Sequence, residues 1–212
     1  MKVMVVCVGK LKEKYWRDAI AEYSKRLSRY MKLEIIELAD EKAPENMSDA
    51  QAAEVKEREG QRILKNVKDD AFAVALAVEG KMLSSEELAE FMAKKSVGGV
   101  SHIVFIIGGS LGLSPAVMRR ADYALSFSRM TFPHQMMRVV LLEQIYRSER
   151  IQRMKNVPFI GVVCWLLALS ILINGHQEKK KAAEEAAKQP AIVTETNETN
   201  DGDTPSTVIF PE

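Results

Sequence analysis

Residues 123–147 have the sequence YALSFSRMTFPHQMMRVVLLEQIYR, and they decide how the rest of the chain is interpreted. A short β-prone run at 123–126 is followed by a loop of small and polar residues. Pro133 suits the first turn of a helix, because its missing N–H costs nothing there. The helix expected at 135–146 is apolar around most of its circumference, through Met136, Met137, Val139, Val140, Leu141, Leu142 and Ile145. We therefore expect this helix to be buried by its own fold or by a second subunit.

Two ionisable residues of this segment form a candidate catalytic site. Arg138 lies in the middle of the helix, and a guanidinium on such an apolar helix is costly unless an anionic group meets it. His134 lies one turn earlier on the same face. The alternative is structural: an arginine that forms a salt bridge inside the fold, and a histidine that caps the helix.

Basic residues are concentrated in the same part of the chain. Lys and Arg balance Asp and Glu at 18 against 18 over residues 1–118, outnumber them 8 against 3 over residues 119–156, and are outnumbered 4 against 8 over residues 157–212. Seven of the eight basic residues of 119–156 are arginines, whose planar guanidinium suits bidentate contacts with phosphate. The distribution favours a polyanionic partner, with a solvated helix face as the alternative.

Composition indicates a globular protein of a reducing compartment. Hydrophobic residues make up 47% of the 212 residues, which supports a packed core. Cys7 and Cys164 lie in distant apolar runs, so a disulfide framework is implausible and a cytoplasmic location is expected. The N-terminal apolar run is too short for a secretory signal and is expected to be a strand. The sequence has no metal-ligand spacing, and we expect no metal.

Strand-like and helix-like segments alternate before residue 126. The expected strands cover residues 1–8, 33–38, 72–78, 103–107 and 123–126, and the expected helices cover residues 12–30, 50–67, 84–95 and 115–120. This alternation predicts an α/β fold with a mostly parallel sheet and helices on both faces. Ligands of such sheets bind beyond the carboxyl ends of the strands.

A glycine-rich loop follows the fourth expected strand. Residues 108–112 have the sequence GGSLG, which permits close backbone approach to a ligand at a helix start. The spacing differs from the GxGxxG of dinucleotide sites, and no Lys-Ser or Lys-Thr follows as in a phosphate-binding loop. A dinucleotide is therefore disfavoured, and the alternatives are a different ligand or a tight turn that needs positive φ.

Three stretches closely resemble the ribosomal RNA large subunit methyltransferase H family, which belongs to the SPOUT methyltransferases. They are IIGGSLGLS at 106–114, LSFSRMTFPHQMMR at 125–138 and EQIYR at 143–147, and the start KVMVVCVGKLKEKY at 2–15 is also similar to that family. The resemblance covers about the first 150 residues, in the same order and at the same spacing.

The resemblance implies a C-terminal trefoil knot, a homodimer, and methylation of N3 of a pseudouridine in large-subunit (23S) rRNA with S-adenosylmethionine as donor. Carried over position by position, the cofactor contacts fall on Leu76, Gly108, Phe127, Ser128, Arg129, Met130, Thr131 and Phe132. Methyl transfer needs N3 to lose its proton. Arg138 is the candidate for stabilising the deprotonated base, and His134 is the candidate for accepting the proton.

The C-terminal part departs from the family. Family members end in Pro-Tyr-His-Lys after the long helix, whereas this chain continues with Phe159 and Ile160 in place of the tyrosine and histidine. The alternative to an active enzyme is therefore a catalytically impaired paralogue that binds the cofactor or RNA and is tethered to a membrane.

Residues 156–177 carry no charged side chain and include the apolar run WLLALSILI at 165–173. Three interpretations remain open: a membrane anchor with the catalytic domain in the cytoplasm, an apolar helix folded onto the domain or the dimer, and a fusion or frameshift product. The expected domains are a methyltransferase domain at 1–153, an apolar helix at 154–177, which is a candidate transmembrane segment, and an acidic, largely disordered tail at 178–212.

Overall fold

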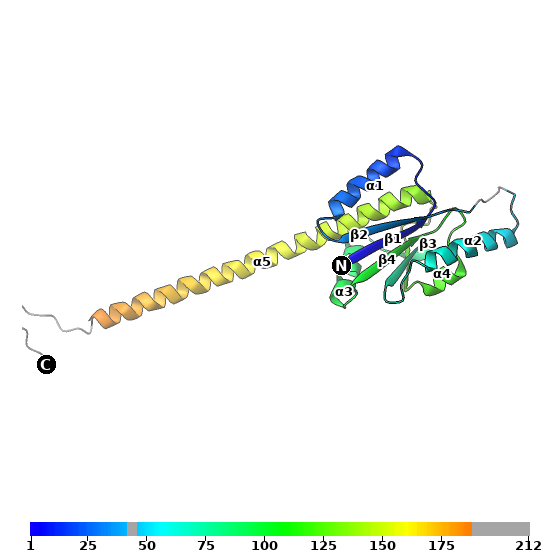
Figure 1. Cartoon of the computed structure of the whole chain (residues 1–212). Helices are drawn as coiled ribbons and strands as arrows, with labels where there is room; N and C mark the ends of the chain where they lie inside the picture. Colours follow the sequence, from blue (N-terminus) through cyan, green and yellow to red (C-terminus); the bar gives the residue numbers. More distant parts are fainter. Residues whose placement is uncertain (42–45, 188–212) are drawn as a thin grey trace, which may run out of the picture. The chain divides into compact units, whose positions relative to one another are not determined.

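The fold is built on a five-stranded parallel sheet. The computed structural model describes residues 1–41 and 46–187, and the strand order is β2-β1-β4-β3-β5 (Figure 1). The strands are β1 (Lys2–Val8), β2 (Lys32–Leu38), β3 (Phe72–Met82), β4 (His102–Ile107) and β5 (Tyr123–Ser126). The helices are α1 (Lys14–Leu27), α2 (Asp49–Leu64), α3 (Ser85–Val97), α4 (Pro115–Arg120) and α5 (His134–Ala187). All strand pairs are parallel, which confirms the α/β class expected from the alternation of segments.

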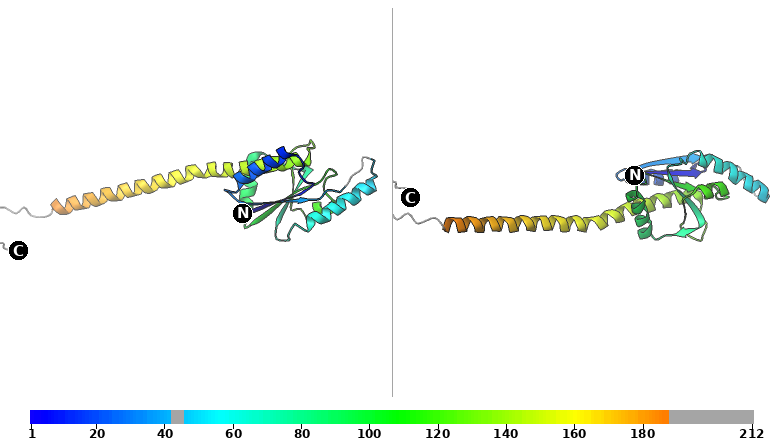
Figure 2. Two further views of the ribbon diagram at one scale, coloured as in Figure 1. Left: turned by 45° about the horizontal axis from the view of Figure 1, so that its top comes forward. Right: turned by 90° about the horizontal axis from the view of Figure 1, so that it is seen from below.

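Each face of the sheet packs against its own set of helices. Because successive side chains of a strand point to opposite faces, Val3, Val5 and Cys7 of β1 enter one core, whereas Met4, Val6 and Val8 enter the other. The first core contains residues of α1, α3 and the first turns of α5, and the second contains residues of α2 and α4. Figures 1 and 2 show α2 and α4 next to each other beside the sheet.

The helix starts follow from local sequence. Ser48 forms a capping box with Gln51 at the start of α2, and Ser84 forms one with Glu87 at the start of α3, as expected for residues 84–87. Ser114 caps α4, and Pro115 occupies its first turn. These caps set where each helix begins after its strand.

Helix α5 begins directly after Pro133, whose carbonyl accepts a hydrogen bond from the Met137 N–H at 3.0 Å. Leu141, Leu142 and Ile145 are fully buried in the first core. The apolar helix expected at 135–146 is therefore buried by its own fold. The helix itself is much longer than expected, because it continues to Ala187.

Strand β3 also extends beyond the expected 72–78. It pairs with β5 first through Val74 to Leu76 and again through Lys81 and Met82, with an irregularity between the two parts. A Cβ placed on Gly80 would lie 2.7 Å from the Leu125 carbonyl carbon, so only glycine permits this approach. Gly80 lies just after the expected end of the strand, and it allows β3 to pair again with β5.

The C-terminal part of the chain forms a separate unit. Contacts divide the chain into Met1–Ile160 and Gly161–Glu212. In the second unit, α5 continues to Ala187. The predicted disordered tail at 178–212 falls partly on this helix, and residues 188–212 lie outside the described residues.

The membrane anchor expected within 154–177 is not supported. No helix in the part of the chain that the structure describes is long and apolar enough to span a membrane. The side chains of residues 156–163 lie outside the described set.

Candidate functional site

A cavity of about 820 Å³ lies at the carboxyl ends of β4 and β5, next to the part of β3 where pairing with β5 is irregular. This part of β3 contributes Leu76 to Glu79, β4 and its following loop contribute Ile107 to Leu113, and β5 and its following segment contribute Leu125 to Ser128. Residues 130–134 and Met137 complete the lining together with Lys56 of α2 and Met118 of α4. The cavity therefore lies where parallel sheets bind ligands, as the alternation of strands and helices predicts.

The glycine-rich loop after β4 forms one wall of the cavity. The Gly112 N–H donates to the Gly109 carbonyl at 3.1 Å and closes a tight turn, in which Gly112 has φ +85°. A Cβ placed on Gly108 would lie 2.9 Å from the Gly112 carbonyl carbon and oxygen. The tight turn with positive φ, one of the two alternatives left open by the sequence, is therefore present, and the loop also lines the cavity.

The segment after β5 forms the opposite wall. The buried Ser126 hydroxyl lies within hydrogen-bond distance of the Val78 carbonyl, 2.9 Å, and of the Ser128 carbonyl, 3.0 Å. The Met130 N–H donates to the Ser128 hydroxyl at 3.0 Å. These contacts hold the turn after β5 against the irregular part of β3 at Val78.

Most of the residues predicted to contact a cofactor line this one cavity. They are Leu76, Gly108, Phe127, Ser128, Met130, Thr131 and Phe132. Arg129 belongs to the same segment, but its exposed side chain is not among the lining residues. The fold thus places residues that are more than fifty positions apart in the chain around the same cavity.

His134 lines the cavity at the start of α5. Burial lowers the pKa of its imidazole, and the neighbouring Arg138 guanidinium lowers that pKa further, while Asp40 opposes the shift. A Cβ placed on Gly9 would lie 2.8 Å from His134 Nε2, so this ring packs directly against the backbone after β1. The imidazole is therefore held neutral near pH 7 and can accept a proton.

Arg138 lies behind His134 and is only 1% exposed. Its Nη2 donates to the Val8 and Gly9 carbonyls, both at 2.7 Å, and its Nη1 donates to Glu37 Oε1 at 2.9 Å. Arg138 thus connects α5 to the carboxyl ends of β1 and β2. This is the internal salt bridge that the sequence left open as the alternative, and Arg138 is not among the residues that line the cavity.

The other basic residues of 119–156 differ in their surroundings. Arg120 donates to the Lys68 and Ala71 carbonyls, Arg147 pairs with Glu143, and Lys155 pairs with Glu90. Arg153 lies over the Tyr30 ring, 4.4 Å from its centroid. Arg119, Arg129 and Arg150 are exposed, and within the described ranges none of these three forms an ion pair.

Three residues near the cavity were missed by reasoning from the sequence. Lys56 and Glu79 line it, and Gly9 packs against His134. Gly9 directly follows the expected strand at 1–8 and carries no side chain to suggest a site, and Lys56 belongs to a highly charged helix that gives no sign of facing one. Among residues 1–41 and 46–187, no group of His, Cys, Asp and Glu could hold a metal ion.

Comparison with known proteins identifies the family. Residues 1–157 match the family model described as "Predicted SPOUT methyltransferase". The chain is 62% identical over 151 residues to the ribosomal RNA large subunit methyltransferase H of Bifidobacterium adolescentis, covering 71% of this chain and 95% of the relative. The protein of the same name from Bifidobacterium animalis subsp. lactis matches with the same identity and coverage. These matches confirm the resemblance drawn from the sequence motifs, and we conclude that the chain is a methyltransferase of the SPOUT family, in the ribosomal RNA large subunit methyltransferase H group.

Proposed function

We propose that this protein transfers a methyl group from S-adenosylmethionine to N3 of a pseudouridine in large-subunit rRNA. The observation that carries the proposal is the convergence of the segments after β4 and β5 with an irregular part of β3 on one cavity, which is lined by seven of the eight positions that the family resemblance assigns to the cofactor. The rRNA substrate rests on the names of the two relatives, and the N3 position and the donor rest on the family resemblance.

The residues present fit such a cofactor. The loops around the cavity present backbone groups and apolar side chains, which suits a ligand with an adenine ring and an amino-acid end. The backbone of the lining loop itself requires glycine at position 108, because a Cβ there would lie 2.9 Å from the Gly112 carbonyl. When bound, S-adenosylmethionine supplies an electrophilic methyl group on a sulfonium sulfur.

His134 is our candidate for the proton acceptor. N3 of a pseudouridine carries a proton that has to leave before or during methyl transfer, and a neutral imidazole in the cavity wall is suited to accept it. The lowered pKa of His134 keeps the imidazole in this form at neutral pH. The deprotonated base would then be more nucleophilic at N3.

In this proposal Arg138 does not line the cavity and acts through its contacts with neighbouring residues. Its guanidinium is held by two backbone carbonyls and Glu37, and it is one helical turn from His134. We propose that it keeps the start of α5 and the Gly9 turn together, and so orients the imidazole. Its positive charge also favours the neutral form of His134.

Three arginines that are exposed and form no ion pair among the described residues are our candidates for binding the rRNA backbone. Arg119, Arg129 and Arg150 are exposed, and Arg129 follows two lining residues directly. A target base in an RNA loop is already partly unstacked, so moving it into a cavity costs less than in a duplex. Since ribosomes are the substrate, we place the activity in the cytoplasm.

We also propose the homodimer and the trefoil knot that the family resemblance implies. Three large apolar side chains close to the cavity support the dimer, because Met130 is 71%, Phe132 42% and Met136 39% exposed. The strand order supports the knot, because β5 pairs at the edge beyond β3 whereas the following α5 packs back into the first core.

The test is methylation of assembled ribosomes. Purified full-length protein is incubated with labelled S-adenosylmethionine and ribosomes from a strain that lacks this modification, and the large-subunit rRNA is digested and analysed by mass spectrometry. We expect one labelled nucleotide, a pseudouridine methylated at N3. Cofactor binding without transfer would instead show that the Phe159 and Ile160 ending has removed catalysis.

A further inference from the structure

Glu59 of α2 is buried and has no cationic hydrogen-bond partner among residues 1–41 and 46–187. Its side chain belongs to a residue only 4% exposed, and it is the one acidic residue among the buried polar residues of the described chain. Its Oε1 accepts a hydrogen bond from the Glu41 N–H at 3.1 Å. Burial raises the pKa of this carboxyl, and the nearby Asp40 and Glu41 also raise it, whereas the Glu41 N–H and Arg62 oppose the shift.

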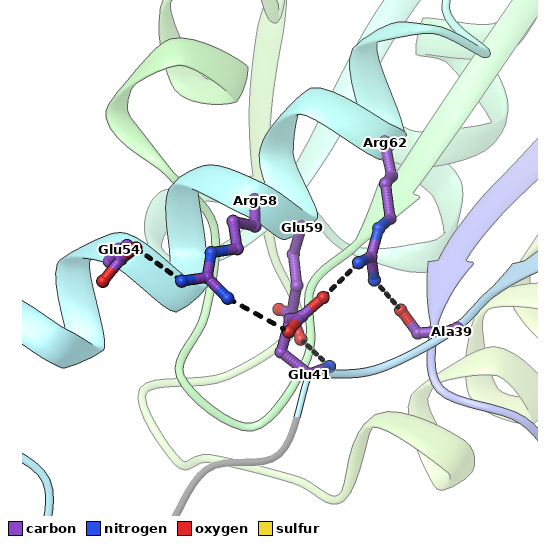
Figure 3. Close-up of polar contacts among 6 residues, drawn as sticks. All are labelled: Ala39, Glu41, Glu54, Arg58, Glu59 and Arg62. Carbon is purple, nitrogen blue, oxygen red and sulfur yellow. Dashed lines mark hydrogen bonds and ion pairs between the residues drawn. The ribbon is translucent and has the colours of Figure 1, made fainter.

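The neighbouring arginines pair with Glu41 rather than with Glu59. Arg62 binds the Glu41 carboxylate and donates to the Ala39 carbonyl at 2.9 Å, and Arg58 lies 3.7 Å from the same carboxylate (Figure 3). These contacts fix the chain after β2 against α2. Glu59 completes this network because its Oε1 accepts the hydrogen bond from the Glu41 N–H. Its other oxygen, Oε2, lies near Gly109.

The other side of the Glu59 carboxylate lies against the glycine-rich loop of the cavity. A Cβ placed on Gly109 would lie 2.9 Å from Glu59 Oε2 and 3.3 Å from Oε1. This close approach is possible because α2 itself packs tightly on α4, where a Cβ on Gly60 would lie 2.2 Å from Ser114 Oγ. Gly109 lines the cavity, so the carboxylate is separated from the cavity by the thickness of one backbone.

Stability does not account for a carboxylate at this place. A carboxyl group buried with a single hydrogen bond disfavours the folded state unless something compensates for its lost hydration. An apolar side chain would fill the same space at lower cost. Glu59 contacts a loop of the candidate cofactor site, so its role there is explained by function rather than by stability.

We propose that Glu59 is a positioning residue of the cofactor site, which holds the Gly108–Gly112 turn in place by filling the space behind Gly109 and bonding to the Glu41 N–H. This inference rests on the proposed function. Glu59 does not line the cavity, and it acts through the backbone of Gly109. The carboxylate thereby links the cofactor loop to the chain after β2.

The first test compares Glu59→Ala with Glu59→Gln in the full-length protein. Gln keeps the volume and an oxygen for the Glu41 N–H, whereas Ala keeps neither. By calorimetric titration with S-adenosylmethionine, we expect Glu59→Ala to bind about tenfold more weakly and Glu59→Gln to stay within about threefold of the wild type. Glu54→Ala is the matched control, because Glu54 lies on the same helix, is exposed and pairs with Arg58, and it should bind normally.

A second variant pair tests the contact itself. Gly109→Ala places a methyl group against the carboxylate and should weaken cofactor binding, whereas adding Gly109→Ala to Glu59→Ala should cost less than it does in the wild type. Equal costs in both backgrounds would overturn the proposal. Wild-type cofactor affinity in Glu59→Ala would also overturn it. If Glu59→Ala lost RNA affinity and melting temperature in parallel with cofactor affinity, the role of Glu59 would be merely structural, and the proposal would again be overturned.

Hydrogen exchange of the cofactor-free protein separates this inference from the proposed function. The Gly112 N–H, which closes the turn, should exchange faster in Glu59→Ala than in Glu54→Ala or the wild type. Faster exchange in a protein that never binds S-adenosylmethionine would support the positioning role and refute the function. Unchanged exchange would refute the positioning role.

Discussion

Replacement of Arg138 by alanine should destabilise the methyltransferase domain more than any other single arginine substitution in α5. The guanidinium is 1% exposed and donates to the Val8 and Gly9 carbonyls and to Glu37. Alanine would remove all three hydrogen bonds together. It would also leave a cavity between α5 and the ends of β1 and β2.

The size of the loss follows from these contacts. A buried acceptor left without a donor costs about 1–3 kcal/mol, and Arg138→Ala leaves two such carbonyls. The ion pair adds less, because the Glu37 side chain is 32% exposed and can be hydrated again. We expect the free energy of unfolding to fall by roughly 3–5 kcal/mol, most of it from the two carbonyls left without a donor.

Urea denaturation followed by circular dichroism measures this change. Arg147→Ala is the matched control, since Arg147 lies on the same helix, is 54% exposed and pairs with Glu143 one turn away. It should cost only about 0.3–0.5 kcal/mol. Arg138→Lys should fall between the two, because one ammonium group cannot reproduce the planar fork. A loss below about 1 kcal/mol for Arg138→Ala would refute the structural role assigned to this residue.

Three further predictions concern the cavity. Gly108→Val should reduce S-adenosylmethionine affinity roughly hundredfold or more, since its Cβ would lie 2.9 Å from the Gly112 carbonyl; calorimetry within threefold of the wild type would exclude Gly108 from the site. Ser126→Ala should cost about 1 kcal/mol of stability and loosen the turn after β5, which denaturation and hydrogen exchange would detect. Because the pKa of His134 is lowered, its neutral form should persist below pH 6.5. The contribution of His134 to stability should therefore be complete above pH 6.5 and should decline as the pH falls toward the folded-state pKa. An NMR titration of the imidazole that gave a pKa of 6.5 or higher would contradict this prediction.

Local sequence was sufficient for the elements of the fold. Apolar β-branched runs predicted the buried strands, and caps such as Ser84 with Glu87 predicted where helices begin, because both signals depend on neighbours within a few residues. The motifs at 106–114 and 125–138 were sufficient for the family. Strand ends were less predictable, as in β3, where Gly80 permits renewed pairing with β5 rather than ending the strand.

The positions of single side chains in the site depended on contacts between distant parts of the chain. From sequence, Arg138 had two interpretations, and only the packing of α5 against the ends of β1 and β2 selected the internal ion pair. Glu59 belongs to a charged helix that suggests solvent exposure, and its burial results from the close approach of α2 to α4 and Gly109. The sequence by itself therefore determined the order and type of the elements and the family. Only the tertiary structure decided which charged residues lie inside, because burial is a property of the surfaces that meet and not of the residue that is buried.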